Sequence, residues 1–132
     1  MDSIFTKIVK GEIPSYKVAE NETCYAFLDI NPLTKGHTLV IPKKQVDYLF
    51  DLDEESYVEL QLFAKKVAKA LGKAIPSIRV AEAVIGLDVP HAHIHLIPIN
   101  SESDVDFRKE RVKLTPEEFV QIAESIRKEF SL

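Results

Sequence analysis

Residues 91–97 read His-Ala-His-Ile-His-Leu-Ile, and this alternation restricts the fold more than any other part of the chain. Successive side chains of a β-strand point to opposite faces of a sheet. A strand over 91–97 therefore places His91, His93 and His95 in a row on one face, at steps of about 7 Å. Its other face is wholly apolar, as is typical of residues that face a core. The pattern predicts a sheet with one buried side and one histidine-bearing side.

The rest of the chain predicts an α+β domain, with a mostly antiparallel sheet and helices packed on it. Apolar and β-branched segments bounded by turn residues predict five strands, over residues 16–19, 24–30, 37–41, 77–84 and 91–97. Apolar residues at helical spacing predict three helices: a short one capped by Asp2 or Ser3, a long one from Asp51 or Asp53 to about Gly72, and a last one from Thr115 to about Phe130. No repeat or linker divides residues 1–132, so we expect a single domain.

The composition restricts the partners and the location of the chain. A net charge of −4 disfavours a nucleic-acid partner, although a small anion can still bind in a locally positive pocket. Cys24 is the only cysteine, so neither an internal disulfide nor a tetrahedral thiolate zinc site can form within one chain. We find no signal peptide and no apolar run near the roughly 20 residues of a membrane span. We therefore expect a cytoplasmic protein without membrane contact.

The histidine row has three interpretations. The rings could be exposed or hydrogen-bonded side chains without chemistry, although three of them in register are hard to explain by packing. They could ligate zinc or iron, with Asp88 as an added carboxylate, because alternating strand histidines can chelate a metal. The interpretation that we favour is a nucleophilic histidine with histidine neighbours. Imidazole titrates near neutral pH, so it can attack in its neutral form and hold or donate protons nearby.

The same residues resemble the signature of the histidine-triad (HIT) family, His-φ-His-φ-His-φ-φ with φ apolar, which residues 91–97 match throughout. Three upstream segments resemble the family too: an opening segment over residues 4–14, a nucleoside-binding strand and loop over 27–32, and a following strand over 36–44. Together these matches cover most of residues 3–98. The likeness is to the Hint-like and bacterial branch.

The resemblance implies a fold and a reaction. Members of the family have a sheet of about five antiparallel strands, a HIT-like fold, and they usually form dimers with the long helix at the interface. They cleave at the α-phosphorus of purine nucleoside phosphoramidates or dinucleoside polyphosphates, through a nucleotidyl-histidine intermediate. By this likeness we expect a nucleotidyl hydrolase or transferase that needs no cofactor, acts on a small nucleotide and forms a homodimer.

The resemblance also assigns roles to residues. His93 is the expected nucleophile, and His95 the expected contact to phosphate oxygens. His37 and His91 would orient the nucleophile or bind near it. Asp29 is expected to bond the ribose hydroxyls, although it could also simply cap a turn. The base would lie among apolar side chains that, on pattern alone, could equally be core: Ile4, Phe5, Ile8, Phe27 and Ile30.

The chain departs from the family pattern at two places. Many relatives hold a structural zinc through Cys-x-x-Cys and histidines, but here the corresponding positions carry Ser3, Thr6 and Gln45, so we expect no structural zinc. Relatives also carry an asparagine and a Gln-Ser/Thr segment that bind phosphate, where this chain has Leu87 and Asp88. A carboxylate repels phosphate at close range. A nucleotide-binding module with little turnover is therefore the alternative function.

Overall fold

The computed structural model describes residues 1–130 and contains a five-stranded antiparallel sheet in the order β1-β2-β3-β5-β4. The strands are β1 (Lys17–Glu20), β2 (Cys24–Leu28), β3 (Thr38–Pro42), β4 (Arg79–Ala83) and β5 (Ile94–Ile99). The helices are α1 (Ile4–Val9), α2 (Glu54–Ala74) and α3 (Pro116–Glu129), with short 3-10 helices at Leu49–Asp51 and Glu102–Val105. The expected α+β fold with five antiparallel strands is confirmed.

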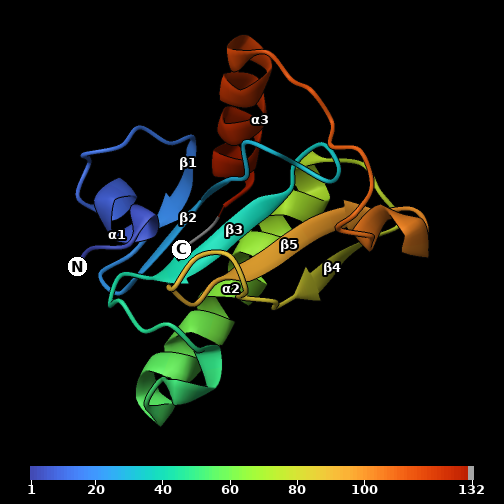
Figure 1. Ribbon diagram of the computed structural model, residues 1–132. Coiled ribbons are helices and arrows are strands. Elements are labelled where there is room, and N and C mark those ends of the chain that lie inside the picture. The colour runs from blue at the N-terminus through green and yellow to red at the C-terminus, as the bar shows by residue number, and fades with distance from the viewer. Residues whose placement is uncertain (131–132) are drawn as a thin grey trace.

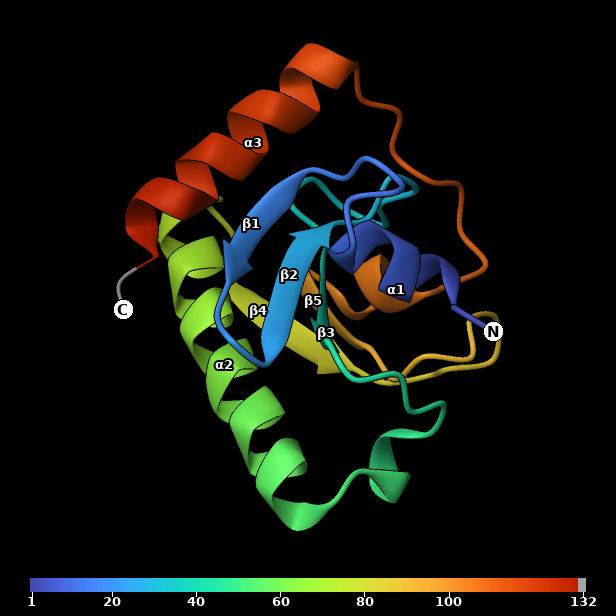
Figure 2. The same cartoon turned by 90° about the vertical axis from the view of Figure 1, so that its left-hand side faces the viewer.

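Helices cover the two faces of the sheet unequally. Figure 1 shows the long helix α2 running across one face, and Figure 2 shows α2 and α3 together on that side with α1 on the other. The larger core lies between the sheet and α2 and α3, and it contains Ala92, Ile94 and Leu96. A smaller cluster joins Phe5 and Ile8 of α1 to β2 and β3 on the opposite face. The apolar residues of the histidine run therefore do face the main core.

The strand expected over residues 91–97 is wrong in its bounds. β5 begins only at Ile94, so His91 and His93 lie in the irregular segment that precedes it. The reason is the lack of a strand partner: β3 pairs with β5 only as far as the Val40–Ile94 pair, and the Ala92 N–H donates to the Val46 carbonyl instead. The alternation nevertheless persists through the segment, because Ala92 packs in the main core whereas the rings of His91 and His93 pack against Phe5 of α1.

The helix ends follow local capping chemistry. Ser3 caps α1 by accepting a hydrogen bond from the Thr6 N–H at 3.0 Å. Thr115 and Glu118 form a reciprocal capping box before α3, as their spacing predicts. α2 begins after Asp53 and runs two residues past the expected end at Gly72. Within residues 1–130, no helix combines the length and the apolar character needed to cross a bilayer.

Candidate active site

A cavity of about 730 Å³ opens on the α1 side of the sheet, next to the histidine segment. All five apolar residues that the sequence places around a base line this cavity. Phe5, Ile8 and Phe27 are buried in its wall, whereas Ile4 and Ile30 are 49% and 67% exposed at its rim. An apolar slot with a partly exposed rim is suited to a flat heterocycle.

The polar residues of the site form two layers. Asp29, His93 and His95 line the cavity, whereas His37 and His91 lie behind them and are 1% and 0% exposed. All four histidines are buried to at least nine-tenths. The structure therefore brings the expected histidines together, but it separates two that can meet a ligand from two that can only act through their neighbours.

His93 presents its Nε2 atom to the cavity. Its Nδ1 lies 2.7 Å from the His91 carbonyl oxygen, and because a carbonyl only accepts, Nδ1 must carry the proton. In the neutral ring, Nε2 then keeps its lone pair. No buried side-chain N or O within residues 1–130 lacks a hydrogen-bond partner, so Nε2, which has none there, reaches solvent in the cavity. The Phe5 ring packs edge-on against the imidazole at 5.0 Å and fixes its plane.

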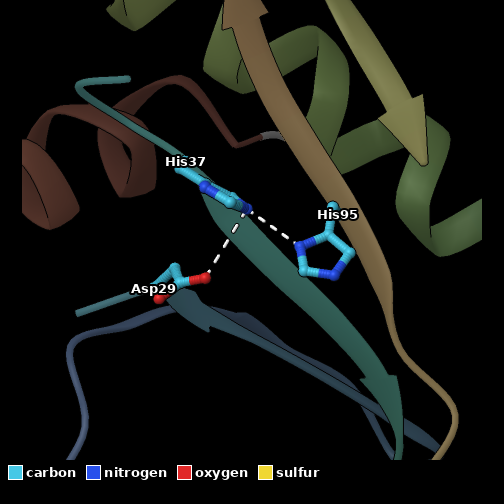
Figure 3. A group of neighbouring side chains, drawn as sticks. All are labelled: Asp29, His37 and His95. Carbon is cyan, nitrogen blue, oxygen red and sulfur yellow. Dashed lines mark hydrogen bonds and ion pairs between the residues drawn. The ribbon is translucent and has the colours of Figure 1, made fainter. Parts of the chain in front are cut away.

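A second chain of hydrogen bonds sets the proton positions of His37 and His95. The Leu33 N–H donates to Nδ1 of His37 at 3.0 Å, so the proton of the neutral His37 ring sits on Nε2. That Nε2–H donates to Nδ1 of His95 at 2.9 Å, as Figure 3 shows. The proton of His95 is thereby placed on its own Nε2. His95 thus offers a hydrogen-bond donor to the cavity, next to the lone pair of His93.

Burial keeps these rings neutral. Desolvation, helped by the His95 ring and the Arg111 charge, lowers the pKa of His37 to about 3. Desolvation, together with His93 and Arg111, lowers the pKa of His95 to about 4. At neutral pH both side chains therefore hold the tautomers that their partners impose, and neither carries a charge.

His91 is held from both sides. Its Nε2 donates to the Pro42 carbonyl at 2.8 Å, so its Nδ1 accepts from the Ser3 hydroxyl at 2.7 Å. Ser3 also caps α1, and its backbone N–H donates to the Gln45 side chain at 2.7 Å. The Thr6 hydroxyl donates to the same Gln45 oxygen at 2.7 Å. A hydrogen-bonded network thus joins the three positions at which the family pattern has zinc ligands. Through His91, the network ties α1 to the backbone carbonyl that accepts the hydrogen bond of His93.

Asp29 lies at the end of β2, beside the His37–His95 pair. Its N–H donates to the His37 carbonyl at 2.9 Å, which prolongs the β2–β3 ladder by one residue. One carboxylate oxygen accepts from the Asn31 N–H at 2.8 Å, and the other lies 3.6 Å from Nε2 of His37. Burial raises the pKa of the Asp29 carboxyl, against the opposing effects of Asn31 and Arg111. Asp29 therefore caps the turn before Asn31 and at the same time lines the cavity.

Asp29, His37 and His95 also form the one grouping within residues 1–130 whose ligand atoms, all within 4.8 Å of one another, could hold a metal ion (Figure 3). The tautomers argue against this use. A metal needs the Nε2 lone pair of His37, which would move the proton to Nδ1 and set it against the Leu33 N–H at 3.0 Å. The cluster therefore fits a network that places protons better than it fits a metal centre.

Two cavity residues that come from the C-terminal part of the chain were assigned no role from the sequence. Phe107 and Arg111 lie in the segment after β5 and line the cavity. Most of their neighbours in this segment are charged, which is typical of a solvent-exposed chain and gives no sign of a binding site. The Phe107 ring packs edge-on against His95 at 5.0 Å. Asp88 lines the cavity but is exposed, and it does not belong to the Asp29, His37 and His95 grouping that could hold a metal ion.

Comparisons with known proteins agree with this architecture. The family model of the HIT domain matches residues 10–102. The adenosine 5'-monophosphoramidase hnt1 of Schizosaccharomyces pombe is 39% identical over 128 residues, covering 96% of each chain. An uncharacterized HIT-like protein of Borreliella burgdorferi is 38% identical over 133 residues, covering 95% of this chain and 96% of its own. A crystal structure of a Hit-like protein from Bartonella henselae superposes with a TM-score of 0.84 at 32% identity, covering 97% of this chain and 96% of that one.

Proposed function

Because the chain belongs to the HIT-domain family, we propose that it is a nucleotide hydrolase that attacks the α-phosphorus of its substrate with Nε2 of His93. The observation that carries the proposal is the hydrogen bond from Nδ1 of His93 to the His91 carbonyl. It leaves the Nε2 lone pair facing a cavity that also holds an apolar slot and a carboxylate. The substrate classes are purine nucleoside phosphoramidates and dinucleoside polyphosphates. The phosphoramidase name of the fission-yeast relative supports the first of these.

The reaction proceeds by two displacements at phosphorus. The Nε2 lone pair forms a bond to phosphorus, and the bond to the leaving group breaks with its electron pair, which takes up a proton from solvent. The resulting nucleotidyl-imidazolium is stabilised through its Nδ1–H by the His91 carbonyl. Water then attacks phosphorus, loses a proton and displaces the ring, which releases the nucleoside monophosphate.

The neighbours of His93 bind rather than react. Nε2–H of His95 donates to an oxygen of the phosphate, where negative charge develops in the transition state. Asp29 accepts hydrogen bonds from the ribose hydroxyls, and the apolar slot between α1 and β2 takes the purine. His37 and His91 do not line the cavity, so they act as positioning residues for His95 and His93.

The test compares two variants of the nucleophile. His93→Ala removes the ring, and His93→Asn keeps a side-chain N–H where Nδ1 lies but has no counterpart of Nε2. We expect both to lose roughly a thousandfold or more in the release of nucleoside monophosphate from an adenosine phosphoramidate, with chelator present. A His93→Asn protein that hydrolyses at the wild-type rate would overturn the proposal.

A second candidate function is a nucleotide-binding module with little turnover. It is favoured by the segment before the histidines, where the exposed Leu87 and Asp88 line the cavity in place of the family's phosphate-binding side chains. This module would bind a nucleoside monophosphate saturably and form no covalent adduct. Detection of a nucleotidyl adduct on His93 by intact-mass measurement decides for the hydrolase.

The oligomeric state and the location complete the proposal. We propose a homodimer that uses α2, on which Val58 and Leu62 are 47% and 58% exposed although both are apolar. The cytoplasm is the proposed compartment, which agrees with a single cysteine, Cys24, that is buried and free.

A further inference from the structure

The cavity holds an unusual balance of charge for a site that binds anions. Two carboxylates line it, those of Asp29 and Asp88. Its histidines, His93 and His95, are not permanent cations. Among the cavity-lining residues within 1–130, Arg111 is the one lysine or arginine. A nucleotide that enters therefore meets a single fixed positive charge, and this charge comes from a segment that the family signature does not include.

Arg111 is held in place by backbone oxygens and an aromatic ring. Its Nη1 donates to the Asn31 carbonyl at 2.6 Å, and its Nη2 donates to the Phe107 carbonyl at 3.2 Å. The guanidinium carbon lies 5.7 Å from the centre of the Phe107 ring, which in turn packs against His95. The charged group is thus positioned on the same side of the cavity as the donor of His95.

Arg111 forms no ion pair with a carboxylate among residues 1–130, although its charge opposes part of the rise in the pKa of Asp29. Arg108 of the same segment, by contrast, is paired with Asp106 at 3.1 Å. Two of its five N–H groups donate to carbonyls, so three remain for a ligand. A half-buried guanidinium in this state is suited to phosphate oxygens, which it can bind through two parallel hydrogen bonds.

We propose that Arg111 binds phosphate in the cavity, in addition to the donor of His95, and selects nucleotides that carry charge beyond a single phosphate. This inference rests on the proposed function, and it favours dinucleoside polyphosphates over phosphoramidates as substrates. In a polyphosphate the group beyond the α-phosphorus is itself anionic, and Arg111 offers it the positive charge that Leu87 and Asp88 do not supply. In a phosphoramidate that group is an amine.

The experiment measures binding of adenosine, AMP and ADP by calorimetry in a His93→Ala background, so that no ligand is consumed. Arg111→Gln removes the charge, and Arg111→Lys keeps it without the planar fork. Arg108→Gln is the matched control, because Arg108 is exposed, lies three residues away and does not line the cavity. We expect Arg111→Gln to weaken ADP binding at least about tenfold, AMP binding less and adenosine binding less than about twofold. Arg111→Lys should be intermediate, and Arg108→Gln unchanged.

The pattern across the three ligands separates the possible outcomes. Equal weakening of all three by Arg111→Gln overturns the proposal, because it means that Arg111 only supports the Asn31 loop. Unchanged affinity for ADP overturns it as well, and leaves the proposed hydrolase intact. If neither the His93→Ala protein nor the wild-type protein binds any of the three ligands, the proposed function itself fails, and this inference fails with it.

Discussion

Each of the four histidines is defined by the partner of one ring nitrogen. The Leu33 N–H, the Pro42 carbonyl and the His91 carbonyl fix the tautomers of His37, His91 and His93 respectively. The tautomer of His95 follows from that of His37. The result is a lone pair on one cavity-facing nitrogen and a proton on the other, although the side chains are chemically identical.

The buried histidines predict a loss of stability in mild acid. The ordinary pKa of histidine is about 6.5, whereas the pKa is about 3 in folded His37 and about 4 in folded His95. At pH values between the folded and the unfolded pKa of each histidine, the unfolded chain therefore binds more protons than the folded one. The stabilisation is complete above pH 6.5 and is lost as the pH falls toward 4, at about 1.4 kcal/mol per pH unit for each histidine. The raised pKa of Asp29 acts in the opposite direction.

Urea unfolding midpoints between pH 7 and pH 5 measure this effect. We expect the wild-type midpoint to fall steadily across the range, and His95→Asn to show a shallower slope because one titrating group is gone. Identical slopes for the two proteins would contradict the assignment of the acid sensitivity to this site.

At the scale of elements, short segments outside the regular strands position the active groups. His91 and His93 precede β5, and their geometry depends on a hydrogen bond to Val46 and on the attachment of α1 through Ser3. His37 sits at the entrance of β3, after a loop whose last residue is Gly36. The strands supply a rigid frame, and the segments at their ends present the chemistry.

Gly36 precedes β3, and we predict that replacing it with any residue that has a Cβ atom lowers the stability of the fold. Its φ is +94°, and a Cβ atom there would lie 3.0 Å from Ile75 Cγ1 and 3.2 Å from Leu71 Cδ1. Gly36→Ala should therefore lower the free energy of unfolding by about 1–3 kcal/mol, through backbone strain and overpacking. Gly72→Ala is the control, because its Cβ would meet only Val80 at 3.8 Å inside α2, and alanine favours helix by roughly 1 kcal/mol. Equal stability of the two variants in urea would refute this explanation.

At the scale of the whole molecule, one edge of the sheet and part of α2 present apolar side chains to solvent. β4 is an edge strand, and exposed apolar side chains lie beside it and on α2, among them Ile78 at 73% and Leu62 at 58%. An unpaired edge together with exposed apolar residues is typical of an interface. These features support the proposed homodimer.

The dimer prediction is tested on α2. Leu62→Glu places a charge on the exposed apolar part of this helix and should shift the protein toward monomer in sedimentation velocity at micromolar concentration. Val120→Glu, at a position of α3 that is 44% exposed, is the matched control and should leave the association unchanged. A wild-type protein that sediments as a monomer would remove the basis for this interface.

The sequence by itself determined the number of strands, the cap of α3, and the cluster of His91, His93 and His95 on the side away from the main core. These features are local, because alternation and helical spacing follow from backbone geometry over a few residues. It also placed Asp29 and the apolar slot, through the family likeness. It left the cap of α1 open between Asp2 and Ser3.

Only the tertiary structure decided which nitrogen His91 and His95 present. The deciding partners are 49 residues apart for His91 and Pro42 and 58 residues apart for His95 and His37. The partners of His37 and His93 are nearer in the sequence, at four and two residues. Tertiary packing also brought Arg111 to the cavity, from a segment whose charged composition reads as solvated chain. Desolvation and the long-range hydrogen bonds depend on groups that meet only after folding, and no local pattern encodes them.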